Sequence, residues 1–344
     1  MRVLVTGGTG YVGAFTVQAL IDAGHQPRLL VRNPKRLATT VGAIGVDIDG
    51  LEIANGDMTD AAAVAEATSG VDAVIHCAAS VGVLNQSEAK ASVDVNINGT
   101  KTVLDAALAA GCDPVVHTSS VSALFDPSQP VIHAELPPAI NADSHYTRSK
   151  ALAEQYAREK QAAGAPVVIV YPGGVAGPRA GENVGELAEG FVSMLKSGVV
   201  PLSGGAFTIL DARDLAQVMV RVLASERGPR RFMTGGTFVD MAEVGRMLRA
   251  ITGRRMPVLP LPGVTFRALG RVTDVVRKAV PFDTVFTAEA MTTLTRARPT
   301  DDSAVHDELG VTYREPLDIA EATVRGLYAN GRLTAKQVGK VATA

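Results

Sequence analysis

A tyrosine and a lysine stand four positions apart, at Tyr146 and Lys150, within the stretch YTRSK. If this stretch is helical, both side chains lie on one face, because residues i and i+4 are neighbours on a helix. A lysine ammonium held there favours ionisation of the phenol beside it. A phenol tuned in this way can pass a proton to or from a reacting oxygen near neutral pH. Such pairs also arise by chance on solvated helix faces, so this pair needs support from the rest of the chain.

A glycine-rich stretch near the N-terminus, TGGTGYVG at residues 6–13, gives that support. Gly7, Gly10 and Gly13 follow an apolar run and open a helical pattern, which is the setting that a dinucleotide-binding loop requires. Glycines permit a tight turn close to a pyrophosphate, and the N–H groups at a helix N-terminus favour its charge. The loop therefore predicts a dinucleotide cofactor, although a glycine turn at a strand end can also be purely structural.

The second apolar run ends at Arg32, and Lys35 and Arg36 follow closely. An acidic residue at this place would bind the ribose 2′-hydroxyl and favour NAD. A guanidinium instead suits a phosphate, so we expect NADP(H) rather than NAD as the cofactor. The alternative is that these basic residues form only a solvated edge of the fold.

Short apolar runs alternate with helical patterns through the first half of the chain. This alternation predicts an α/β fold of Rossmann type, a doubly wound parallel sheet with helices on both faces. Ligands of such sheets lie beyond the carboxyl ends of the strands, where Ser119 and Ser120 follow an apolar run. The expected strands are 2–6, 28–31, 51–54, 73–78, 114–118 and 166–171, and the expected helices are 11–23, 60–68, 87–110 and 145–163.

The pattern loosens after about residue 172, which suggests a smaller, mostly helical lobe. We expect residues 1–172 to form the NADP-binding domain with the catalytic residues, and 173–328 to be mainly the substrate lobe. Residues 205–235 are expected to return in part to the first domain, and 329–344 to form a tail that frays. Helices are expected at 184–197, 211–226, 240–252, 264–280 and 316–328.

Composition excludes several classes of protein. A formal net charge of −2 over 344 residues argues against a general nucleic-acid binder. No apolar run approaches the ~18 residues of a membrane span, and the N-terminus shows no signal-peptide pattern. The two cysteines, Cys77 and Cys112, indicate neither a disulfide framework nor a metal site. We therefore expect a cytoplasmic protein.

One expected helix, 264–280, has an apolar and a basic face. A basic amphipathic helix can lie on a membrane surface. The favoured interpretation is nevertheless a helix of the lobe with a solvated polar face, because the apolar face lacks the Trp, Phe and Leu of an interfacial anchor. The apolar face contains Ala268, Val272, Val275, Val276 and Ala279, and the polar face contains Arg267, Arg271, Asp274 and Lys278.

The order of these motifs resembles the extended short-chain dehydrogenases/reductases, over most of the chain. Besides the glycine loop and the Tyr/Lys pair, the matching segments are NGDM at 55–58, HCAA at 76–79, DVNINGT at 94–100, TSS at 118–120 and LDARD at 210–214. The last of these is taken as structural. The resemblance implies cofactor contacts by Gly7, Thr9, Gly10, Tyr11, Val12, Gly13, Arg32, Lys35, Asp57, Met58, Ala78, Ala79, Tyr146, Lys150, Tyr171, Pro172 and Val175.

The resemblance also implies a mechanism in which NADPH delivers a hydride to a carbonyl carbon. Tyr146 would protonate the developing alkoxide, and Ser120 would bind the same oxygen. Lys150 would lower the pKa of Tyr146 and hold the nicotinamide ribose, and Asn96 would support the proton relay. Each role has a plain structural alternative: a turn for Ser120, an outer helix face for Asn96, and an ion pair with Glu154 for Lys150.

Three activities remain open: a reductase of ketones or aldehydes, a sugar-nucleotide epimerase or dehydratase, and a non-catalytic dinucleotide sensor. The resemblance favours the reductases, near dihydroflavonol reductases, cinnamoyl-CoA reductases and 3β-hydroxysteroid dehydrogenases. Epimerases usually carry Arg-Tyr-Phe-Asn where this chain has Tyr171 to Gly174, and sensors commonly lose the Tyr/Lys pair.

The substrate is expected to be an apolar or aromatic carbonyl compound, with a sterol as one candidate. This expectation rests on the mostly apolar residues that should line the pocket: Val81, Leu84, Tyr171, Val175, Met194, Phe207 and Phe282. By analogy with the family, a homodimer could form through the helices at 87–110 and 145–163.

Overall fold

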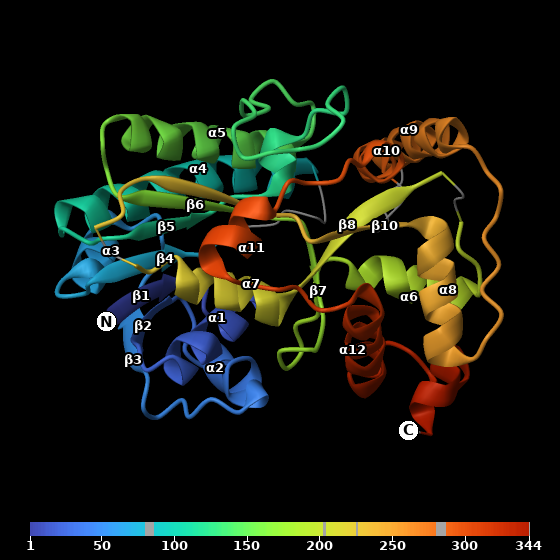
Figure 1. Ribbon diagram of the computed structural model, residues 1–344, viewed down its shortest axis with the longest axis horizontal. Helices are drawn as coiled ribbons and strands as arrows, with labels where there is room; N and C mark the ends of the chain where they lie inside the picture. Colours follow the sequence, from blue (N-terminus) through green and yellow to red (C-terminus); the bar gives the residue numbers. More distant parts are fainter. Residues whose placement is uncertain (80–85, 202–203, 225, 280–286, 344) are drawn as a thin grey trace.

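In the described part of the chain, seven parallel strands form the central sheet (Figure 1). The computed structural model describes residues 1–79, 86–201, 204–224, 226–279 and 287–343. The strand order is β3-β2-β1-β4-β5-β6-β9, and all neighbouring strands run parallel. The strands are β1 (Arg2–Thr6), β2 (Gln26–Val31), β3 (Glu52–Asn55), β4 (Ala73–His76), β5 (Val115–Thr118), β6 (Val167–Pro172) and β9 (Arg230–Thr234).

Helices cover both faces of this sheet, which explains why its strands are apolar on both sides. In β1, Leu4 faces one layer while Val3 and Val5 face the other, and all three are fully buried. The Rossmann-type α/β fold expected from the sequence is therefore confirmed. One layer contains α3 (Ala61–Thr68), α4 (Gln86–Ala109) and α5 (His145–Ala162), and the other contains α1 (Tyr11–Asp22), α7 (Ala212–Arg221) and α11 (Ser303–Leu309) (Figure 1).

The smaller lobe has a sheet of its own, which the sequence did not predict. Helices α6 (Ala188–Ser197), α8 (Met241–Thr252) and α12 (Pro316–Ala329) pack around it. The segment expected to return to the first domain divides between the two sheets, since β8 joins the small sheet while α7 and β9 belong to the central one. The small sheet has the order β10-β8-β7 and consists of β7 (Gly174–Ala176), β8 (Ala206–Asp211) and β10 (Thr237–Asp240).

The C-terminal residues pack against the smaller lobe, so the expected frayed tail is wrong. Leu333, Val338 and Val341 are buried in the core of that lobe. They lie in or before α13 (Ala335–Val338) and the 3-10 helix η3 (Gly339–Ala342). The small, polar composition of this segment hid three apolar side chains spaced closely enough to dock.

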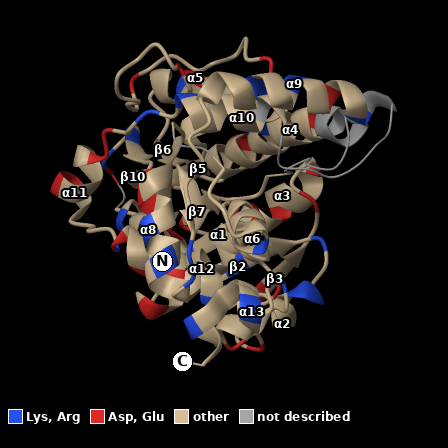
Figure 2. Ribbon diagram, turned by 90° about the vertical axis from the view of Figure 1, so that its right-hand side faces the viewer, with Lys and Arg blue, Asp and Glu red and all other residues tan. Residues whose placement is uncertain are grey.

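Two further helices, α9 (Gly263–Ala279) and α10 (Ala288–Arg296), lie side by side at one edge of the molecule (Figure 1, Figure 2). The helix expected at 264–280 is present, but its orientation reverses the favoured interpretation: the apolar face points outward. The remaining short helices are α2 (Arg36–Thr39), η1 (Gly42–Ile44) and η2 (Val121–Leu124). Among the described residues, no helix is both long and apolar enough to cross a membrane.

Candidate active site

The loop between β1 and α1 requires glycine at two positions. Gly7 has a φ of +77°, and a Cβ on it would lie 2.6 Å from the backbone nitrogen of Ala78. A Cβ on Gly13 would collide with the carbonyl of Gly7. Helix α1 follows Gly10 with no side-chain cap and no acidic residue in its first turn. Its first N–H groups can therefore serve an anion, and this cradle fits the pyrophosphate of a dinucleotide.

Tyr146 and Lys150 lie one turn apart at the start of α5. Ser144 begins this helix, because its side chain accepts a hydrogen bond from the backbone N–H of Thr147 at 3.0 Å. The ammonium of Lys150 is buried and donates to the carbonyl oxygen of Thr118 at 3.2 Å. This bond joins the start of α5 to the carboxyl end of β5.

The other two predicted catalytic residues lie at the same junction. Asn96, on α4, is buried and donates from Nδ2 to the hydroxyl of Ser149 at 3.4 Å. That hydroxyl in turn donates to the carbonyl of Tyr146 at 2.9 Å. Ser120 follows β5 and caps η2, which packs along α5. Asn96 therefore does not lie on an outer helix face. Ser120 occupies the turn that its structural alternative describes, and it also lies near α5.

Lys150 lies in a web of titratable groups. Burial lowers its pKa, and Glu186 opposes that shift more strongly than Cys77 or Glu154. Glu154 does not form an ion pair with Lys150, since its carboxylate contacts Arg158 instead, at 2.6 Å. The surface-pair alternative for Lys150 is therefore wrong.

Glu186 is the site residue that sequence reasoning missed. It precedes α6, and although its side chain is exposed, the protein surrounds its carboxylate closely enough that burial raises its pKa. The ammonium of Lys150 acts in the opposite direction. Nothing local marks this glutamate in the sequence, because only the fold brings residue 186 to residue 150.

Hydrogen bonds attach the segment before α6 to the glycine loop and to the start of α1. Asn183 donates from Nδ2 to the carbonyl of Thr9 at 3.1 Å, and Tyr11 donates its hydroxyl to the carbonyl of Pro178 at 2.8 Å. A Cβ on Gly185 would lie 2.9 Å from the ring of Tyr11. These contacts explain how Glu186 comes to lie close to Lys150.

Two buried histidines lie behind Lys150 in the central sheet. The rings of His76, on β4, and His117, on β5, stack with centroids 5.8 Å apart. His76 bonds Thr6 at 2.7 Å and Thr100 at 3.2 Å, whereas both ring nitrogens of His117 have no partner among the described residues. Burial, with Lys150 adding to it, lowers the pKa of His76 to about 3. Burial holds the pKa of His117 well below its usual value, and the charges of His76 and Lys150 lower this pKa further.

The predicted adenosine end of the site lies at the edge of the sheet. Arg32 follows β2 and is strongly exposed, and its Nη1 lies 3.5 Å from Oδ2 of Asp57. Met58 packs its sulfur against Gly99 of α4. The other predicted cofactor contacts divide as follows: Lys35 is exposed before α2, Val12 lies in α1, Ala78 and Ala79 follow β4, and Pro172 ends β6.

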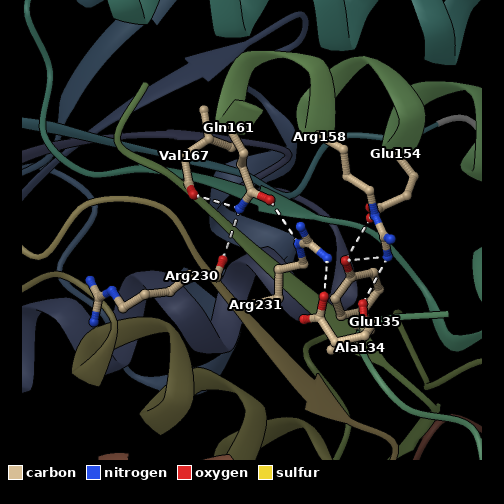
Figure 3. Close-up of polar contacts among 9 residues, drawn as sticks. Ala134, Glu135, Glu154, Arg158, Gln161, Val167, Arg230 and Arg231 are labelled. Atoms are coloured by element: carbon tan, nitrogen blue, oxygen red, sulfur yellow. Dashed lines mark hydrogen bonds and ion pairs between the residues drawn. The ribbon is translucent and has the colours of Figure 1, made fainter. Parts of the chain in front are cut away.

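Tyr171 does not line a pocket, so its predicted side-chain contact with substrate is wrong. Its ring is fully buried, and its hydroxyl donates to Glu154 at 2.6 Å. Arg158 completes the network with bonds to Glu154, at 2.6 Å, and to the carbonyl of Ala134, at 2.8 Å (Figure 3). Gln161 of the same helix bonds the carbonyls of Val167 and Arg230, which ties α5 to β6 and β9 (Figure 3).

The other predicted substrate contacts have mixed positions. The side chains of Met194 and Val175 are buried within apolar cores of the two lobes. Phe207, on β8, is half-buried. Val81, Leu84 and Phe282 lie outside the described residues.

Comparison with known proteins gives one family and several relatives. Residues 3–235 match the sequence model of the NAD dependent epimerase/dehydratase family. Sterol demethylase protein B of Methylococcus capsulatus is 29% identical over 90% of this chain and 93% of its own length. A 3 beta-hydroxysteroid dehydrogenase/Delta 5-->4-isomerase of Mycobacterium tuberculosis is also 29% identical, over 77% of this chain and 73% of its own length.

A solved structure shows the same fold at lower identity. The UDP-glucose 4-epimerase of Bifidobacterium longum, in complex with NAD+ and UDP, superimposes with a TM-score of 0.73. The two sequences are 20% identical, and the match covers 96% of this chain and 99% of the epimerase chain. At this identity the likeness concerns the fold alone.

Proposed function

This chain belongs to the NAD dependent epimerase/dehydratase family, and from that premise we propose that it is an NADP(H)-dependent oxidoreductase that interconverts a carbonyl compound and its alcohol. The observation that carries the proposal is the junction of β5 and α5, where Lys150 bonds Thr118 one turn from Tyr146. The relatives that act on steroids by name support an oxidoreductase among the activities of this family.

The residues of the junction have complementary roles in this proposal. The phenol of Tyr146 donates its proton to the substrate oxygen, and the ammonium of Lys150 favours the phenolate that remains. The hydroxyl of Ser120 binds the same oxygen, and Asn96 fixes the start of α5 through Ser149. The bound nicotinamide would supply the hydride.

Gly174 supports a carbonyl substrate over a sugar nucleotide. The family's epimerases place an asparagine here, but a Cβ on Gly174 would lie 2.6 Å from the carbonyl oxygen of Thr208 and 2.9 Å from the side chain of Leu187. An asparagine side chain therefore has no room at this position. We propose an apolar or aromatic substrate, with sterols within that class, acted on in the cytoplasm.

The test is NADPH oxidation across a panel of ketones and aldehydes, including steroid ketones, with NADH in parallel. Tyr146→Phe should lower turnover by about 10²-fold or more, because the proton donor is lost, while NADPH binding measured by fluorescence persists. Tyr156→Phe is the matched control, since Tyr156 lies on the same helix but bonds Asp105 at 2.6 Å. Full activity of Tyr146→Phe would contradict the mechanism, and a sugar nucleotide released on denaturation would favour an epimerase.

The preference for NADP(H) is tested separately through Arg32. Replacing Arg32 with Asp should lower kcat/KM for NADPH by about ten- to a hundredfold, because a charged hydrogen bond to the 2′-phosphate is lost. The value for NADH should change far less. Arg221→Asp, on the exposed end of α7, makes the same charge change away from the site. An unchanged ratio of NADPH to NADH efficiency in Arg32→Asp would refute the assignment.

A further inference from the structure

Helix α9 turns its apolar face to solvent. Val264, Leu269, Val272, Val275 and Val276 are each between 45% and 65% exposed. We refer to these five residues as the α9 outer face. Of the 13 large apolar side chains that are exposed in the described chain, seven lie between residues 259 and 276. Single exposed apolar residues are ordinary, but such a concentration in one short stretch marks a surface for a partner.

The orientation of α9 is fixed by its inner side. Phe266 is buried there, and a Cβ on Gly270 would lie 2.7 Å from the carbonyl oxygen of Thr287, so the helix backbone approaches the start of α10 closely. Asp274 accepts the backbone N–H of Ala288 at 2.9 Å, and Arg267 donates to Thr295 at 2.9 Å. Rotating α9 to bury its valines would break these bonds and put a side chain where only glycine fits. The residues on the inner side of α9 therefore determine that its apolar face points outward.

The charge of this region selects the kind of partner. Helix α9 contains four basic residues and one acidic residue, a net charge of +3 in a chain whose net charge is −2. Arg271 is exposed beside the outer face, and basic positions follow α9 along the edge of the molecule (Figure 2). Two copies of this chain pairing through the face would bring two such basic regions together, which is unfavourable. An anionic, apolar surface fits both properties at once.

We propose that the α9 outer face lies on an anionic lipid bilayer, with its valines at the boundary of headgroups and acyl chains and with Arg271, exposed beside the face, on the lipid phosphates. This interaction is independent of the proposed reaction, because it uses no residue of the active site. It would hold the smaller lobe against the membrane without any described helix crossing the bilayer.

The proposal is tested by sedimentation of the purified full-length protein with vesicles. Vesicles of phosphatidylglycerol and phosphatidylcholine should pellet the protein at low ionic strength, whereas pure phosphatidylcholine should not. Binding should fall in 1 M salt, because the Debye length drops to about 3 Å. Replacing both Val272 and Val275 with Glu should lower partitioning by about tenfold or more. Arg271→Glu should lower it by about fivefold or more, the contribution of one basic residue.

Leu317→Glu is the matched control, since Leu317 is 41% exposed on α12 and far along the chain from α9. It should bind vesicles like the wild type. Circular dichroism and thermal unfolding of each variant verify that it is folded. Failure of the wild type to pellet with anionic vesicles at low salt would overturn the proposal. So would a reduced oligomeric mass of the Val272/Val275 double variant, because that would assign the face to a second copy of the chain.

Discussion

Two opposing effects act on the pKa of Lys150. Burial lowers this pKa, and the charges of nearby acidic groups raise it, with Glu186 contributing most. Burial in the core side of the site disfavours the ammonium, while the carboxylate of Glu186 favours it. The proposed role of Lys150 requires the charged form, because only an ammonium lowers the pKa of the nearby phenol. We therefore predict that Glu186 acts as a positioning residue whose charge favours the protonated form of Lys150.

Glu186→Gln is expected to move the alkaline limb of the pH profile of kcat/KM to lower pH. The carboxylate raises the pKa of Lys150, so its removal lets the lysine lose its proton at a lower pH. The measurement is kcat/KM for NADPH-dependent reduction at closely spaced pH values above neutrality.

Glu189→Gln gives the control for this experiment, because Glu189 lies three residues further along and bonds Arg332 at 2.7 Å instead. Its alkaline limb should coincide with that of the wild type. An alkaline limb of Glu186→Gln at the wild-type position would show that the carboxylate does not tune Lys150.

Among the secondary-structure elements, the strands that are buried on both faces were predicted best from the sequence. β1, β4 and β6 are covered by helices on both faces, so they are continuous apolar runs and were readily recognised. The small sheet was missed for the opposite reason. β7 has only three residues, Gly174–Ala176, and β10 leaves most of its short length exposed, so neither has the signature of a buried strand.

The site shows a similar division between local and distant information. The pair on α5 was found because helical spacing alone puts Tyr146 and Lys150 on one face. Tyr171 was misplaced because its partner in the core, Glu154, lies 17 residues earlier on a different element, and no local pattern connects the two. Spacing indicates which residues can meet within a helix, but it does not say which one a strand side chain reaches across a layer.

At the scale of the whole molecule, the two lobes are joined at the cofactor loop. Gly177 donates its backbone N–H to Thr323 of α12 at 2.9 Å, and Asn183 and Tyr11 connect the following segment to the glycine loop. The smaller lobe is thus anchored where the pyrophosphate would lie. We consequently expect binding of the dinucleotide to affect both lobes.

The stability of the whole molecule should depend on pH through the histidines of its central sheet. His76 and His117 are fully enclosed and stay neutral in the folded state, since burial lowers the pKa of both. In the unfolded chain each histidine takes up a proton below its ordinary pKa of about 6.5. Below this pH the unfolded state binds more protons than the folded state. The free energy of unfolding therefore has its full value above pH ~6.5 and decreases as the pH drops below it.

His117→Leu is therefore expected to be more stable than the wild type in acid. Each such histidine costs at most about 1.4 kcal/mol per pH unit in this window. Leucine also removes two ring nitrogens that lack partners among the described residues, which adds about 1–2 kcal/mol at any pH. Urea unfolding at pH 7 and pH 5 measures both effects. His133→Gln, in a loop outside the core, should retain the wild-type difference between the two pH values, and a His117→Leu advantage that does not grow in acid would contradict the linkage to the buried pair.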